Sequence, residues 1–143
     1  MDLLEQAKKA LEAEGVTFAA VSSCGEKKTS QKKGIAPMME ILAECPEFLQ
    51  GAAVADQVIG KAAAFLLRKG GAKYLYAKII SEHALETLQN SGIAVSYGTK
   101  VPYIINRNKD GMCPMEQTVL SVTDVEEAYG KLQEKLRELS GKN

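Results

Sequence analysis

Apolar and polar positions recur along this chain with two different spacings, and these spacings predict its secondary structure. Apolar residues three to four positions apart predict amphipathic helices, and runs of β-branched or aromatic residues predict strands. Helices are expected at residues 2–14, 34–45, 56–69, 81–90 and 125–139, with a short one opening at 113–116. Strands are expected at residues 16–23, 27–31, 73–80, 93–97 and 101–105.

The rest of the chain is expected to pack around residues 51–71, GAAVADQVIGKAAAFLLRKGG. We interpret this stretch as a run of small residues followed by a helix that starts at Asp56 and ends at the glycine pair Gly70 and Gly71. The predicted helix is apolar almost all round. Such a helix must be covered on most sides, so the other elements are expected to surround it.

The connections between these elements predict the topology of a sheet. The strand, helix and strand between residues 73 and 97 form a βαβ unit, whose two strands should be parallel. Only three residues separate the strands 93–97 and 101–105, which is too short for a parallel crossover, so the second should run antiparallel. The order as a whole predicts one domain, residues 1–143, folded as a three-layer α/β/α sandwich with a mixed sheet of about five strands.

Composition narrows the classes of function. Lys plus Arg (18) equals Asp plus Glu (18), so no overall field draws the chain to nucleic acid or to a membrane surface. Three cysteines lie far apart without CxxC spacing and His83 is the single histidine, which excludes a zinc knuckle. The longest apolar run is too short to span a bilayer. We expect a soluble, cytoplasmic protein without a cofactor.

The order of elements resembles the cytidine-deaminase-like fold and, more narrowly, a prokaryotic family of unknown function with that fold. Four segments carry the resemblance: VADQVIGKAAAFLL (54–67), YAKIISEHALETL (76–88), VSYGTKVPYIINR (95–107) and GMCPMEQTV (111–119). The resemblance implies the fold, but the family has no assigned activity to carry over.

Zinc deaminases of this fold carry His-x-Glu at the start of the central helix and Pro-Cys-x-x-Cys at the start of the next one. The histidine and cysteines hold zinc, and the glutamate moves protons to and from the zinc-bound water. The corresponding segments here are ADQV (55–58) and ISEHA (80–84). Neither has the cysteine pair and the first has no histidine, so no metal site and no zinc-dependent deamination are expected.

The leading hypothesis is a binding module that holds a small anionic or nucleotide-like ligand. Helix N-termini favour anions, and open α/β sheets bind ligands beyond the carboxyl ends of their strands. The helices predicted to start at Asp56 and Ser81 should lie side by side at one such end. The candidate ligand-binding residues are Asp56, Lys61, Ser81, Glu82 and Lys100.

Structural roles compete with these assignments. Capping of a helix explains Asp56, and Lys61 falls with Gln57 and Arg68 on one polar, solvent-facing stripe. His83 and Asp56 could hold a metal weakly, although an ordinary surface histidine is the simpler interpretation.

Cys113 and Asp56 are the candidate catalytic residues, and whether the protein is an enzyme stays open. Cys113 precedes Pro114 and a first helical turn, a setting that favours the reactive thiolate. Glu116 can bond back to the Cys113 amide as a cap, and its charge would oppose the thiolate. An antiparallel strand 101–105 would place Asp56 and Cys113 at opposite ends of the sheet.

Two further hypotheses therefore stand beside the binding module. One is an enzyme that uses the Cys113 thiol. The other is a structural, homo-oligomer-forming protein with residues 101–107 and 111–116 at a subunit interface.

Overall fold

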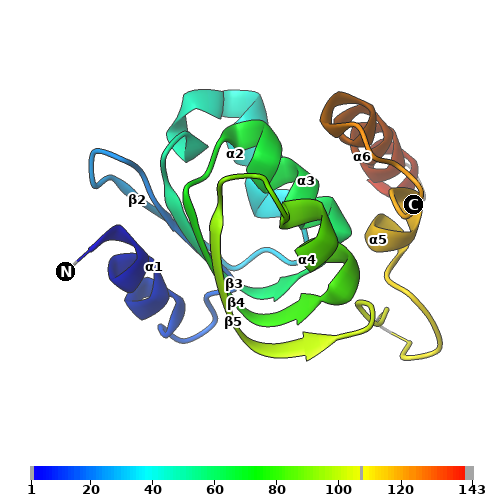
Figure 1. The fold of residues 1–143 in the computed structure, drawn as a ribbon, viewed down its shortest axis with the longest axis horizontal. Coiled ribbons are helices and arrows are strands. Elements are labelled where there is room, and N and C mark those ends of the chain that lie inside the picture. The colour runs from blue at the N-terminus through cyan, green and yellow to red at the C-terminus, as the bar shows by residue number, and fades with distance from the viewer. Residues whose placement is uncertain (1, 107, 141–143) are drawn as a thin grey trace.

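The computed structural model describes residues 2–106 and 108–140 (Figure 1). The elements are α1 (Leu3–Leu11), β1 (Phe18–Val21), β2 (Lys27–Ser30), α2 (Ala36–Glu44), the 3₁₀ helix η1 (Pro46–Leu49), β3 (Ala53–Ile59), α3 (Lys61–Gly70), β4 (Tyr74–Ser81), α4 (Glu82–Leu88), β5 (Ala94–Val101), α5 (Pro114–Thr118) and α6 (Val125–Ser140).

The strands form one mixed sheet in the order β2-β1-β3-β4-β5. β1 is antiparallel to both β2 and β3, whereas β3, β4 and β5 are parallel to one another. The predicted α/β fold with a mixed sheet of five strands is therefore confirmed. The lysine-rich β2 lies at the edge of the sheet, as its polar sequence predicts.

Helices cover both faces of the sheet (Figure 1). The helix α1 packs on one face, where Ala7 and Leu11 meet small side chains of β1 and β3. The helices α2, α3 and α4 cover the other face and enclose the larger core, which includes Phe18, Leu66 and Leu75. The C-terminal helices α5 and α6 pack outside α3. The predicted three layers are present, although one of them consists of α1 alone.

The central stretch contains a strand as well as a helix, so the predicted helix at 56–69 is wrong in its first part. β3 runs to Ile59, Gly60 caps the helix, and α3 begins at Lys61. Asp56 therefore lies inside a strand and caps no helix. β3 is buried on both faces over its first four residues, and such a strand has the same unbroken apolar pattern as a buried helix.

The two strands predicted at 93–97 and 101–105 are also wrong, because residues 94–101 form the single strand β5, which runs parallel to β4. Gly98 lies in the expected three-residue link, but in β5 it allows a close approach: a Cβ there would lie 2.9 Å from the Lys78 carbonyl oxygen. The predicted number of five strands is still right, because the prediction missed β3 and divided β5 into two strands. Since β5 ends at the same edge of the sheet as β3 and β4, the segment that follows it reaches that edge too.

Two predicted helix starts are confirmed by their capping bonds. The Asp2 carboxylate accepts a hydrogen bond from the Glu5 backbone N–H at 2.8 Å. The Ser81 hydroxyl accepts one from the Ala84 N–H at 3.0 Å. Within the described ranges, no helix combines the length and apolar character needed to cross a membrane.

Candidate functional site

A pocket of about 380 Å³ opens where β3 ends, between the starts of α2 and α3 and the segment that follows β5. We call it the Asp56 pocket. Its apolar lining comes from Ile35, Val58, Ala62, Ala63, Ile104, Ile105 and Met115. Its polar side chains come from Thr17, Lys33, Asp56, Gln57, Cys113 and Glu116. A mostly apolar cavity with a few convergent polar groups is typical of a small-molecule site.

Asp56 is the buried acid of this pocket. It lies in β3 between Phe18 of β1 and Ala77 of β4, and only 6% of its surface is exposed. Burial raises the pKa of the Asp56 carboxyl to about 8, since the charged form loses its hydration; backbone N–H groups of Val58 and Gln57 oppose that rise only in part. Near neutral pH, Asp56 is therefore mostly a neutral carboxylic acid.

Glu116, from α5, forms one wall of the pocket and is 1% exposed. Its carboxylate accepts hydrogen bonds from the backbone N–H groups of Lys61 and Ile104, both at 2.7 Å. It also accepts one from the Ser81 hydroxyl. One carboxylate thus ties together the starts of α3 and α4 and the segment after β5.

Close contact with Glu116 requires glycine at position 60. A Cβ on Gly60 would lie 2.9 Å from Ile104 Cγ1 and 3.2 Å from Glu116 Oε2. The first distance is shorter than a normal carbon–carbon contact. Gly60 therefore lets the segment after β5 lie directly over the start of α3.

The structure brings Asp56 and Cys113 to the same pocket, so their predicted separation within one subunit is wrong. The parallel direction of β5 is the reason, because it carries the chain to the end of the sheet where β3 also ends. The expected back-bond from Glu116 to the Cys113 amide is wrong as well. That N–H donates to the Ile104 carbonyl at 2.6 Å instead.

The other predicted ligand-binding residues divide into two groups. Lys61 and Ser81 do start neighbouring helices, but both donate to Glu116, and the Lys61 ammonium donates to the Leu120 carbonyl at 2.6 Å. Glu82 and Lys100 are exposed and do not belong to the lining of the Asp56 pocket. The predicted stripe that joined Gln57 to Lys61 does not form, because Gln57 lies in β3.

The zinc site implied by the fold resemblance does not fit these residues. The groups at the starts of α3 and α4 that converge on Glu116 are N–H and O–H donors, which suit an anion and repel a cation. Nor does any group of three or more His, Cys, Asp or Glu side chains suited to a metal ion occur among residues 2–106 and 108–140.

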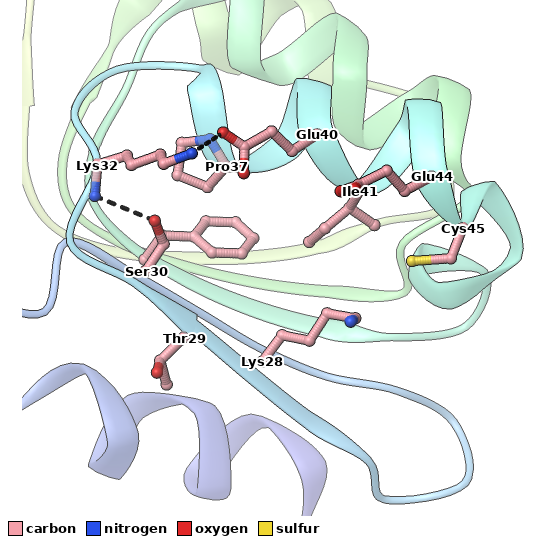
Figure 2. A pocket seen from close by; sticks show the side chains of 10 residues that line it. Lys28, Thr29, Ser30, Lys32, Pro37, Glu40, Ile41, Glu44 and Cys45 are labelled. Atoms are coloured by element: carbon pink, nitrogen blue, oxygen red, sulfur yellow. Dashed lines mark hydrogen bonds and ion pairs between the residues drawn. The ribbon is translucent and has the colours of Figure 1, made fainter.

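A second hollow, of about 350 Å³, lies between β2 and α2 (Figure 2). The Lys32 ammonium bonds to the Glu40 carboxylate beside it, and both side chains are exposed. The Lys28 ammonium lies over the Phe48 ring, 5.2 Å from its centroid. Because these charged groups are exposed and already have partners, Lys32 with Glu40 and Lys28 with the Phe48 ring, the Asp56 pocket is the better candidate for a ligand site.

From residue 6 to residue 136, the sequence matches the family TM1506, described as a domain of unknown function (DUF1893). The chain belongs to this family. A solved structure of a DUF1893 family protein (TM1506) from Thermotoga maritima is 32% identical to it, with a TM-score of 0.84 over 93% of this chain and 89% of that one. The family of unknown function suggested by the sequence is thus confirmed.

A further solved structure is more distant from this DUF1893 protein. It is the diaminohydroxyphosphoribosylaminopyrimidine deaminase/5-amino-6-(5-phosphoribosylamino)uracil reductase from Thermotoga maritima, with 17% identity and a TM-score of 0.43 over 83% of this chain and 39% of that chain. At that score the likeness is too weak to bear on function. No curated protein matches the DUF1893 chain.

Proposed function

We propose that this DUF1893 protein is a zinc-free binding module that holds a small molecule in the Asp56 pocket. The observation that carries the proposal is the buried Asp56 carboxyl group in a mostly apolar cavity. A buried acid with a strongly shifted pKa inside a cleft is a common mark of a functional site. The cavity volume lies within the range of small-molecule pockets.

The protonation state of Asp56 indicates the kind of group it would bind. A neutral carboxyl offers one O–H donor and one C=O acceptor side by side. It therefore complements a carboxamide, a lactam or the edge of a nucleobase, each of which presents an acceptor next to a donor. The nucleotide-like class of ligand proposed from the sequence fits this requirement.

An anionic part of the ligand would bind elsewhere than the sequence suggested. The starts of α3 and α4 already hold the Glu116 carboxylate, and a second anion there would be repelled. Lys33 is exposed and lines the Asp56 pocket. We propose that the Lys33 ammonium pairs with an anionic substituent of the ligand at the mouth of the pocket.

Thermal unfolding in the presence of nucleobases, nucleosides, nucleotides, and small carboxamides and lactams tests this function. A ligand at about 100 times its Kd stabilises the folded state by about 2.7 kcal/mol, which raises the Tm by several degrees. Ala63→Leu should abolish that rise by filling the pocket, while Lys33→Ala should weaken only anionic ligands. Flat curves across the panel, or an equal rise in Ala63→Leu, would contradict the proposal.

The second candidate is an enzyme that uses the Cys113 thiol, favoured by its position in the same pocket as Asp56. Rates of alkylation by iodoacetamide test it against Cys24, which is exposed in the turn between β1 and β2. A Cys113 that reacts no faster than Cys24 leaves the thiol without an assigned role.

A further inference from the structure

We propose that the outer edge of β5 pairs with the β5 edge of a second copy of this chain and joins the two sheets across a two-fold axis. β5 is the last strand of the sheet, and within the described part of the chain its strand partner is β4 alone. This inference is independent of the ligand proposed for the Asp56 pocket.

The two edges of the sheet differ in how they are protected. β2 has four residues, and two of them, Lys27 and Lys28, are the charged type that blunts an exposed edge. β5 is twice as long, has no proline, and carries the single charge of Lys100. Its Tyr97 is 43% exposed. A long edge of this kind is a template for pairing with another strand.

The backbone of β5 shows which groups are free to pair. The Ala94 N–H donates to the Lys73 carbonyl at 2.9 Å, toward the β4 side. Backbone groups of successive residues in a strand point to alternate sides. The residues whose N–H and C=O groups point outward are therefore Val95, Tyr97, Thr99 and Val101.

A two-fold axis at Gly98 places the outward N–H and C=O groups of one β5 opposite the outward C=O and N–H groups of the β5 in the second copy. Val95 then faces Val101 of the second copy, and Tyr97 faces Thr99. Pairs of this type exchange two N–H···O bonds each, so the edge would form a continuous antiparallel ladder.

Side chains at this register favour a second copy over an unrelated strand. The two glycines at position 98 meet at the axis, where side chains in such a pair come closest. Lys100 faces Ser96 of the other copy, so no like charges stand opposite each other. The zero net charge of the chain adds no general repulsion.

The solution mass of the full chain and of a proline variant tests the proposal. Wild type should have twice the 15.4 kDa chain mass by light scattering. Thr99→Pro removes an outward N–H without removing a bond to β4, so it should have the mass of one chain. Thr99→Val keeps the N–H and should remain a dimer. A monomeric wild type, or a folded Thr99→Pro that remains a dimer, overturns the proposal.

Disulfide trapping tests the register even if Thr99→Pro fails to fold. Chains carrying Ser96→Cys and chains carrying Lys100→Cys are mixed and mildly oxidised. The proposed register places these two positions opposite each other, and peptide mass spectrometry should find a disulfide between them only in the mixture. Absence of that disulfide in folded, mixed chains overturns the proposal.

Discussion

Replacing Asp56 by asparagine removes an ionisable group from the pocket while keeping its shape. Asparagine retains an oxygen that can accept the Val58 N–H, which in the native protein lies 3.4 Å from Asp56 Oδ1. The difference between the two proteins therefore comes mainly from the proton. The folded state keeps Asp56 neutral up to a pKa of about 8, whereas the unfolded chain ionises it near 3.8.

The sign and size of the effect follow from these two values. Between them the folded state binds one proton more than the unfolded state, so stability falls as pH rises. The fall is about 1.4 kcal/mol per pH unit. It therefore reaches about 4 kcal/mol at neutral pH and levels off above about pH 8. Asp56→Asn should show none of this loss and should be the more stable protein at pH 7.

Urea unfolding at several pH values between about 4 and 8 measures the effect. The difference in unfolding free energy between Asp56→Asn and wild type should be small at the acidic end and grow steadily toward pH 8. Glu134→Gln, a change at an exposed position of α6, is the matched control and should stay parallel to wild type. If the unfolding free energies of Asp56→Asn and wild type change equally with pH, Asp56 does not hold its proton and is not a buried neutral acid.

Four further outcomes are expected from the start of α3 and from α5 and α6, which pack on α3. Glu116→Gln should lower the unfolding free energy by roughly 1–3 kcal/mol, because the new amide group faces buried donors. As a control, Glu126→Gln removes the exposed partner of Lys69 and should lower it by under about 1 kcal/mol. Gly60→Ala should cost roughly 1–3 kcal/mol by overpacking against Ile104. Gly130→Ala, with open space around it in α6, should instead stabilise by about 0.5–1 kcal/mol. Urea midpoints check all four, and equal midpoints for Glu116→Gln and wild type would show that the carboxylate holds nothing together.

Local pattern predicted most of the elements but failed where a buried strand leads directly into a buried helix. Residues 53–70 are apolar almost throughout, and periodicity cannot divide such a stretch. Gly60 lies at the division and was the available clue. Because β3 was not predicted, Asp56 was assigned to the start of a helix and to a capping role, whereas it lies within a strand.

The pocket itself depended on a long-range feature that no local pattern contains. Glu116 bonds to residues 55, 35 and 12 positions away. Its sequence neighbours suggested only a cap for α5. Likewise, the three residues 98–100 were interpreted as a link between two strands, whereas Gly98 lies inside β5 and allows the close contact between β4 and β5. The division of β5 into two antiparallel strands was the error that separated Asp56 from Cys113.

The most direct test of the account is a titration of the Asp56 carboxyl carbon by NMR, with Asp56→Asn used to assign its signal. We expect a midpoint near pH 8 in the folded protein, as burial in the pocket requires. A midpoint near 4, typical of a solvated aspartate, would contradict the buried neutral acid on which the proposed function rests.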